Sequence, residues 1–219
     1  QIINQAFKLH SQGNISEAIK YYQYFVNQGF KDHRVFSNYG NLLKDLGKLK
    51  EAELLYRKAI KINPDCAEAY SNLGNIFRDF GKLKEAELSY KKAIEINPSL
   101  SEANLMIANL LMKSQKYKEA EEIINKVINI NPKDGHAYYS LGAIFKEIDQ
   151  LKDAEKYIRK AIELKPDFEK AFYLLADLLV KNNKFDEAES YYLKLFKLKP
   201  WSTASAWRLS ALKRRKTKK

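Results

Sequence analysis

Few residues of this sequence have the types and spacing that chemistry at a reacting centre requires. The three histidines, His10, His33 and His136, are far apart, and no pair of them has metal-ligand spacing with Cys, Asp or Glu. No phosphate-binding glycine motif is present. Reactive cysteines need an activating base or cation nearby, and we interpret the single cysteine, Cys66, as a small residue between two helices. We therefore expect no enzymatic activity, no metal and no cofactor in this chain.

Basic residues are concentrated at the end of the sequence. The net charge is +12, and residues 213–219 contain six Lys or Arg, so the rest of the chain carries +6. Such a run can neutralise nucleic-acid phosphates or anionic lipid, or serve as a nuclear import signal, although short basic ends are commonly only solvated tails. No aromatic residue is interleaved for stacking on single-stranded nucleic acid. The residues of this basic tail are Lys213, Arg214, Arg215, Lys216, Lys218 and Lys219.

Composition indicates a folded chain without a membrane span. Hydrophobic residues make up 45% and charged residues 30%, which is too apolar for a disordered chain. The longest apolar stretches, such as residues 174–180, are interrupted by charge and fall short of a transmembrane helix. A single cysteine fits a reducing compartment, so we expect an intracellular protein, cytoplasmic or, in a eukaryote, nuclear.

A fixed period organises the sequence. Successive prolines are equally spaced along the chain, and an alanine stands twelve residues before each proline. Because proline cannot continue a helix, a helix end is predicted to recur with this period, and the alanines predict close approach of two backbones. The prolines are Pro64, Pro98, Pro132, Pro166 and Pro200, and the alanines are Ala52, Ala86, Ala120, Ala154 and Ala188, with Ala18 continuing the series where Phe30 replaces proline.

Within each period the pattern predicts helix, turn, helix. Phe36, Tyr39, Gly40 and Leu43 stand at i, i+3, i+4 and i+7, which is one face of a helix. Seventeen residues before each proline, residues that mostly tolerate left-handed backbone angles predict the turn: Gly13, Gly47, Gly81, Gln115, Asp149 and Asn183. The residues directly after prolines, Asp65, Ser99 and Asp167, are predicted N-caps of the following helices.

The full pattern, as in residues 67–100, is an aromatic residue, Leu-Gly, a second aromatic residue, then alanine, a third aromatic residue and proline; the copy at 101–134 departs from it with Asn104, Ile107 and Ala108. This order resembles the tetratricopeptide pattern, whose repeat is about 34 residues long. The resemblance implies an all-α, right-handed superhelical solenoid of antiparallel helix pairs. Five copies are expected at 33–66, 67–100, 101–134, 135–168 and 169–200, after a divergent copy at 1–32 and before a capping helix at 201–212 and the basic tail at 213–219. We interpret Trp201 and Trp207 as packing residues of the cap.

In this family the first helix of each repeat lines the concave side, so the resemblance implies a binding groove built from first-helix residues. Asparagines recur there once per period, and their amides can pair with the N–H and C=O of an extended peptide. This array is similar to the asparagine ladder of O-linked N-acetylglucosamine transferases, whose repeats contain phrases close to residues 70–75. The alternative is that the asparagines only solvate helix faces. The expected groove residues are Asn38, Asn41, Lys44, Asn72, Asn75, Arg78, Leu105, Met106, Asn109, Met112, Tyr139 and Tyr173.

Along the same face, polar residues are followed by apolar ones in the later repeats. Exposed methionines and tyrosines there suit adaptable peptide recognition. The alternative is that some of them pack between neighbouring helices. The lysine and arginine pattern that captures acidic chaperone C-termini is absent. We therefore expect a scaffold that binds a protein or extended peptide; homo-oligomerisation is not predicted. Because the sequence begins with Gln1 and not with methionine, a larger parent carrying a transferase domain is a further hypothesis, besides tethering through the basic tail.

Overall fold

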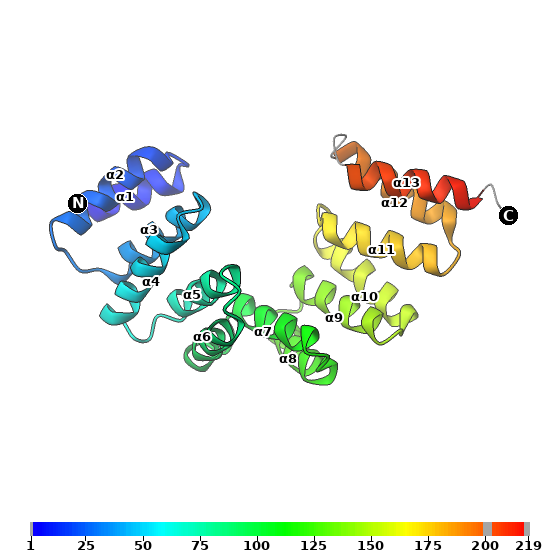
Figure 1. The fold of residues 1–219 in the computed structure, drawn as a ribbon, viewed down its shortest axis with the longest axis horizontal. Helices are drawn as coiled ribbons and strands as arrows, with labels where there is room; N and C mark the ends of the chain where they lie inside the picture. Colours follow the sequence, from blue (N-terminus) through cyan, green and yellow to red (C-terminus); the bar gives the residue numbers. More distant parts are fainter. Residues whose placement is uncertain (1, 199–202, 217–219) are drawn as a thin grey trace. The chain divides into compact units, whose positions relative to one another are not determined.

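The computed structural model describes residues 2–198 and 203–216, and these residues form thirteen α-helices and no strand (Figure 1). The helices are α1 (Ile2–Ser11), α2 (Ile15–Asn27), α3 (His33–Asp45), α4 (Leu49–Ile62), α5 (Ala67–Asp79), α6 (Leu83–Ile96), α7 (Ser101–Lys113), α8 (Tyr117–Ile130), α9 (Gly135–Glu147), α10 (Leu151–Leu164), α11 (Glu169–Lys181), α12 (Phe185–Leu198) and α13 (Thr203–Lys216).

The turn between the two helices of a repeat has the left-handed backbone that its residues predict. The φ angle is 75° at Gly47 and Gly81, and 59° at Gln115, Asp149 and Asn183. A glycine adopts a positive φ without a steric clash because it has no Cβ. Gln115, Asp149 and Asn183 adopt the same backbone conformation at some cost in free energy. The prediction that these positions end the first helix and start the turn is confirmed.

The turn between repeats differs from the prediction at its N-caps. The side chain of Asn63 accepts the backbone N–H of Asp65 at 3.2 Å, and Asn97 accepts that of Ser99 at 3.1 Å. These contacts close the chain around the proline as an Asx turn, so helix α5 begins two residues after Asp65, with Cys66 at its N-cap. The N-cap prediction was therefore wrong for Asp65 and, by the same displacement, for Ser99 and Asp167.

The periodic alanines lie inside the packing of the helices. Ala18, Ala52, Ala86, Ala120, Ala154 and Ala188 are all fully buried. Glycines on the first helices complete this packing: a Cβ added to Gly40 or Gly74 would lie 2.8 or 2.6 Å from the ring of Tyr56 or Tyr90. Tyr56 and Tyr90 thus fill the space that a missing Cβ leaves on the first helix of their repeats.

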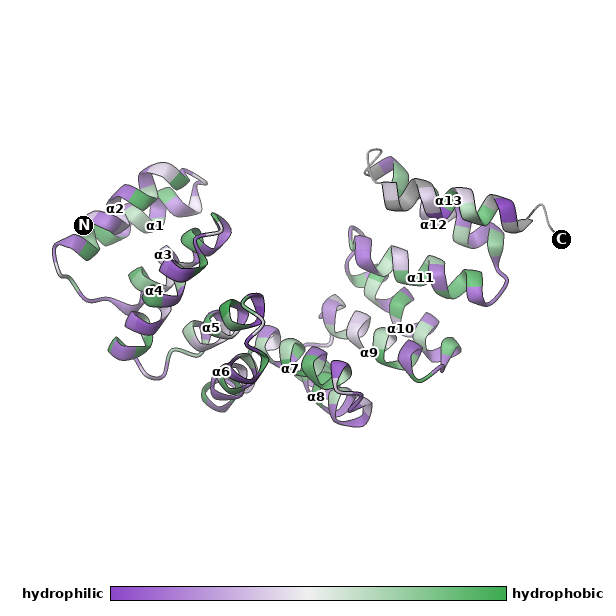
Figure 2. Cartoon of the chain, in the orientation of Figure 1, coloured by the Kyte–Doolittle hydropathy of each residue, from purple (hydrophilic) through white to green (hydrophobic). Residues whose placement is uncertain are grey.

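The chain divides into two compact units, residues 1–110 (unit 1) and 111–219 (unit 2). Unit 1 contains α1 to α6 and most of α7, and unit 2 contains α8 to α13. Within each unit consecutive helices pair as the sequence pattern predicts, α1 with α2, α3 with α4, α5 with α6, α9 with α10 and α11 with α12. Figure 2 shows hydrophobic and hydrophilic residues intermixed along the helices, as expected where one face of each helix is buried. No helix in the described ranges is long and apolar enough to cross a membrane.

Helix α13 occupies the predicted place of the capping helix but extends further. It runs to Lys216, so Lys213, Arg214, Arg215 and Lys216 continue the helix. Its Leu212 is buried and belongs to the core of unit 2, together with residues of α10, α11 and α12. The helix therefore covers the last complete repeat as a first helix would.

Candidate functional site

Two asparagines of unit 1 have amides that are open to a ligand. Asn38 on α3 and Asn72 on α5 stand one repeat apart and are half-buried. Neither side chain has a hydrogen-bond partner within the described parts of the chain. Next to Asn72, the buried Oγ of Ser71 also lacks a partner. Because these two amides make no intramolecular hydrogen bond, they are members of the predicted ladder whose donors and acceptors are available to a ligand.

Asn41 and Asn75 have a different role, although they recur with the same period. The Tyr56 hydroxyl donates to Oδ1 of Asn41 at 2.7 Å, and the Tyr90 hydroxyl donates to Oδ1 of Asn75 at 2.7 Å. Asn75 Nδ2 in turn donates to Glu102 at 2.9 Å. The tyrosine bonds tie the two helices of each repeat together. The asparagine carbonyl oxygens are therefore already engaged, contrary to the expectation that they face the groove as free acceptors.

The tyrosines remain hydrogen-bond donors well above neutral pH. Burial raises the pKa of Tyr90 to about 12, and burial also raises the pKa of Tyr56. A neutral hydroxyl therefore faces each asparagine oxygen under physiological conditions.

The sequence pattern contains a signal for this pairing that the groove prediction missed. A hydrogen-bond acceptor precedes the buried tyrosine by fifteen residues in three repeats, the third pair being Asp177 and Tyr192 at 2.5 Å. Where isoleucine replaces the tyrosine, as at Ile124 and Ile158, the matching positions are the exposed Asn109 and an alanine. At this register the residue fifteen positions later is thus the partner of Asn41 and Asn75, and Asn109 has no such partner.

The remaining predicted residues of unit 1 lie at the same helix faces with partial exposure. Lys44 and Leu105 are half-buried. Arg78 forms an ion pair with Asp79 at 2.9 Å, and its Nη1 lies 3.0 Å from the sulfur of Met106. This contact joins α5 to α7 across neighbouring repeats, so Arg78 and Met106 stabilise the face on which Asn72 lies.

In unit 2 the predicted aromatic anchors are packed. The ring of Tyr139 lies 4.9 Å from that of Phe168, and burial raises the Tyr139 pKa. The guanidinium of Arg208 covers Tyr173 at 5.1 Å from the ring centroid. Both tyrosines therefore serve contacts between neighbouring repeats. Met112, at the end of α7, is half-buried.

The exposed aromatic residue of this face is Trp207, which is 67% exposed. The prediction that it packs as part of the cap was wrong, because α13 takes the place of a first helix and position 207 corresponds to Tyr173 one repeat earlier. Trp207 lines a pocket of about 310 Å³ with Val180 of α11, beside the ion pair of Arg208 and Asp177. Trp201 lies outside the described residues.

Of the basic tail, the structure describes the helical part to Lys216. The Arg214 side chain is exposed, with Nη2 3.3 Å from the Ser210 hydroxyl. Lys218 and Lys219 lie outside the described residues, as do the side chains of Lys213, Arg215 and Lys216.

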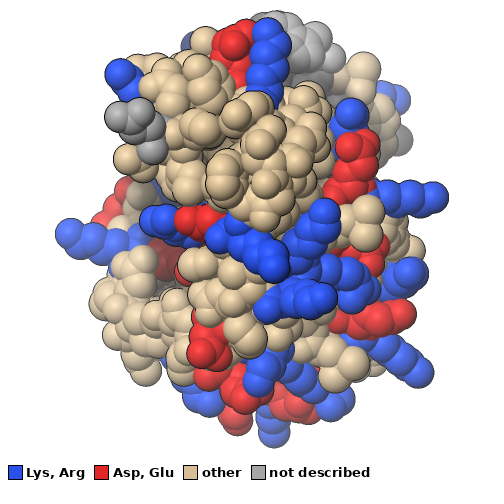
Figure 3. Space-filling view, turned by 90° about the vertical axis from the view of Figure 1, so that its left-hand side faces the viewer, with Lys and Arg blue, Asp and Glu red and all other residues tan. Residues whose placement is uncertain are grey.

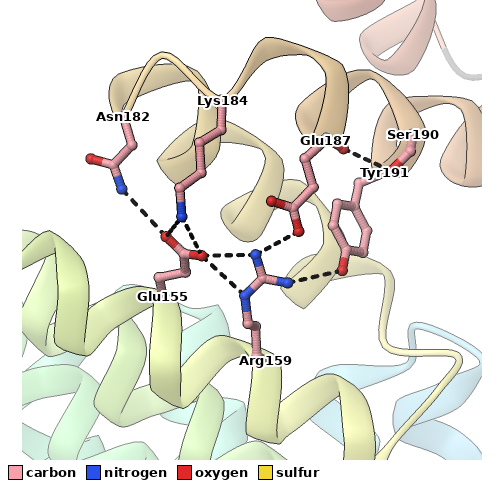
Figure 4. A network of polar contacts seen from close by, with 7 residues as sticks. All are labelled: Glu155, Arg159, Asn182, Lys184, Glu187, Ser190 and Tyr191. Atoms are coloured by element: carbon pink, nitrogen blue, oxygen red, sulfur yellow. Dashed lines mark hydrogen bonds and ion pairs between the residues drawn. The ribbon is translucent and has the colours of Figure 1, made fainter.

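A cluster of charged residues joins two second helices of unit 2 (Figure 4). Glu155 on α10 accepts from Arg159 at 2.7 Å and from Lys184 at 3.0 Å, and Arg159 also donates to Glu187 on α12 at 2.6 Å. Burial raises the pKa of Glu155, but the hydrogen bonds from Arg159 and Lys184 outweigh burial and hold it below its ordinary value. A carboxylate held ionised in this way suits packing of neighbouring repeats better than proton transfer.

No group of three or more His, Cys, Asp or Glu side chains that could hold a metal ion occurs among the described residues. Cys66 is buried, and burial raises the pKa of its thiol. Its environment agrees with a packing role.

This architecture is similar to that of known repeat proteins. Residues 4–210 match the family described as the Cilia and flagella-associated protein 70 C-terminal domain. No curated protein sequence matches the chain. A tetratricopeptide repeat protein from Parabacteroides merdae is 20% identical with a TM-score of 0.72, covering 90% of this chain and 78% of that one.

Two further solved structures are similar. A tetratricopeptide protein of Thermus thermophilus is 19% identical with a TM-score of 0.69, covering 83% of this chain and 98% of its own. The protein YrrB is 21% identical with a TM-score of 0.59, covering 85% and 96%. At such identities the likeness is one of fold. With its periodic helix pairs and the family match over residues 4–210, the chain is a tetratricopeptide-repeat protein and belongs to the family of the Cilia and flagella-associated protein 70 C-terminal domain.

Proposed function

We propose that this chain is a protein-binding scaffold, and that the first-helix face of unit 1 holds an extended peptide by its backbone. The observation that carries this proposal is the pair Asn38 and Asn72, whose half-buried amides have no hydrogen-bond partner within the described residues. An asparagine amide supplies one acceptor and two donors. It can therefore satisfy both the N–H and the C=O of a peptide unit, whatever side chain that unit carries.

The helices that carry the two asparagines support this role. Helices α3 and α5 contact each other directly, so Asn38 and Asn72 lie on neighbouring helices. Arg78 and Met106 hold α5 against α7 next to this surface, and Asn41 and Asn75 hold α3 and α5 against their own second helices. Side chains fixed on packed helices bind with less loss of conformational freedom than side chains on loops.

Two similarities add to the proposal. YrrB, which shares the fold, is described as a tetratricopeptide protein with an unusual peptide-binding site. Residues 70–75 also resemble the asparagine ladder of O-linked N-acetylglucosamine transferases. In unit 2, the pocket beside Trp207 has the size and lining to accept one apolar side chain.

A peptide selection tests the proposal. Random twelve-residue peptides displayed on phage are selected on the chain, and the affinity of the selected peptides is then measured for Asn38→Ala/Asn72→Ala by calorimetry. We expect a loss of about tenfold or more, because several backbone hydrogen bonds are removed, with an unchanged Tm. Unchanged affinity would contradict the backbone-binding role.

The matched control is Asn41→Ala/Asn75→Ala, which removes the same two amides one helical turn further along. Because those amides hold Tyr56 and Tyr90, this variant is expected to lower Tm, with a smaller effect on affinity measured well below the melting transition.

A further inference from the structure

A second surface of unit 1 has features of a binding site and is separate from the first-helix face. A pocket of about 530 Å³ lies between the end of α2, the start of α3 and the end of α4. Its apolar lining includes Phe30, Phe36 and Ile62. Phe30 is 49% exposed and Ile62 is 36% exposed. Large apolar side chains that remain this exposed around a concave surface commonly mark interaction sites.

Positive charge surrounds this pocket. Lys31, Lys58 and Lys61 line it, and no acidic residue does. Lys58 lies over the Phe36 ring at 5.8 Å, and neither Lys31 nor Lys61 has an ion-pair partner among the described residues. Figure 3, which faces the left-hand side of Figure 1, shows a group of Lys and Arg side chains gathered beside uncharged surface.

The next repeat shows that this charge is not a general property of the fold. One period later, Lys31 and Lys61 correspond to Asp65 and Glu95, and Phe30 corresponds to a proline. There Lys92, the counterpart of Lys58, forms an ion pair with Glu95 at 2.9 Å. Around the pocket, Lys31 and Lys61 thus stand at positions that are acidic one repeat later. Lys58 therefore lacks the carboxylate with which its counterpart, Lys92, forms an ion pair.

We infer that this basic pocket binds an acidic segment of a partner protein that inserts one large apolar side chain. The positive charge of the lysines complements the carboxylates of such a segment. Contact with an inserted apolar side chain removes Phe30 and Ile62 from water, which stabilises the complex. A concave apolar floor with three lysines at its rim fits a protruding side chain better than the broad plane of a lipid surface. Helix α3 contributes Phe36 to the pocket, but neither Asn38 nor Asn72 lines it, so we expect binding here not to depend on those two amides.

Fluorescence anisotropy with designed probes tests the inference. The probe is a labelled twelve-residue peptide of Glu, Asp and Ser with one central Phe, and a second peptide replaces this Phe with Ser. We expect the Phe peptide to bind about tenfold more tightly than the Ser peptide, because an inserted aromatic ring removes apolar surface of both partners from water.

The decisive variant is Lys31→Asp/Lys61→Glu, which installs the side chains found one repeat later. We expect it to weaken binding of the Phe peptide at least about tenfold and to leave Tm unchanged. Lys84→Glu/Lys118→Asp makes the same change in net charge at exposed lysines elsewhere and is expected to change affinity less than about twofold. Phe30→Ala tests the apolar floor without altering charge, and we expect a loss of similar size to that of the Ser peptide.

Three results would overturn the inference: no binding of the Phe peptide, equal loss in the two charge variants, or equal affinity for both peptides. Vesicles of phosphatidylserine and phosphatidylcholine serve as the competing probe. If they bind with the same dependence on Lys31 and Lys61 while the peptide does not bind, the pocket is a lipid-binding surface and the inference is wrong.

Discussion

Unit 1 joins the helices of its repeats through neutral hydrogen bonds between a buried tyrosine and an asparagine, Tyr56 with Asn41 and Tyr90 with Asn75. Unit 2 keeps a related pair, Tyr192 with Asp177, and adds charged contacts between repeats, in which Glu155, Arg159 and Glu187 connect α10 to α12. The same repeat pattern is therefore stabilised by different interactions. A first-helix residue is available to a ligand only where its own second helix leaves it unbound, as it does Asn38 and Asn72.

The largest expected difference in stability between the two units concerns Asn75. Asn75→Ala leaves the buried Tyr90 hydroxyl without an acceptor, and we expect it to lower the free energy of unfolding by about 2 kcal/mol. Ala143→Asn in unit 2, which adds an amide opposite Ile158, has no hydroxyl to bind and gains no such stabilisation. Urea unfolding of both variants measures the difference. A loss below about 0.5 kcal/mol for Asn75→Ala would show that the Tyr–Asn bond does not hold the repeat together.

The glycine positions give a somewhat smaller effect. Gly74→Ala places a Cβ 2.6 Å from the Tyr90 ring, which its bond to Asn75 holds in place, and we expect a net cost of about 1 to 2 kcal/mol after the helix-forming gain of alanine. Gly142→Ala meets Cγ1 and Cδ1 of Ile158 and, at 3.2 Å, the backbone oxygen of Ala154; we expect it to cost less, because no hydrogen bond holds the Ile158 side chain in its rotamer. Thermal unfolding of both variants measures the two losses of stability. A larger loss for Gly142→Ala than for Gly74→Ala would contradict the account of unit 1.

Charge gives the smallest effect, and it depends on pH. The pKa of Glu155 is lowered in the folded chain, so its contribution is present above its unfolded pKa and is lost as pH falls through the lower, folded value. Glu155→Gln should therefore cost about 1 kcal/mol at pH 7, since solvent partly screens the half-exposed Arg159, and progressively less below about pH 4. Unfolding followed from pH 3 to 7 tests this, and a pH-independent difference would contradict it.

The tyrosines of unit 1 predict the opposite dependence. Because the pKa of Tyr90 is raised to about 12, its contribution is present below its unfolded pKa, near 10, and is lost as pH rises toward 12. Tyr90→Phe should therefore be less stable than the unaltered chain at neutral pH but approach it in alkali. Unfolding at pH 7 and pH 11 measures this, and a constant difference would show that ionisation of Tyr90 is not coupled to folding.

The helix pairs, turns and packing alanines could be predicted because each depends on local chemistry that recurs in every repeat. Proline ends a helix, glycine accepts a positive φ, and alanine permits close approach, wherever they occur. The role of each groove residue could not be predicted in the same way, because it depends on a neighbour in space. Asn38 and Asn41 are alike in sequence, and only the position of Tyr56 distinguishes them. The exposure of Trp207 likewise depends on α13 replacing a first helix.

The most direct measurement of the central claim is the response of four side-chain amides to a selected peptide. In NMR titration of the full chain, we predict that the NH₂ signals of Asn38 and Asn72 shift and broaden on peptide addition, because they gain the hydrogen bonds that they lack in the free chain. Those of Asn41 and Asn75 should move little, since Tyr56 and Tyr90 already occupy their oxygens. Shifts confined to Asn41 and Asn75, or none at any of the four, would contradict the account.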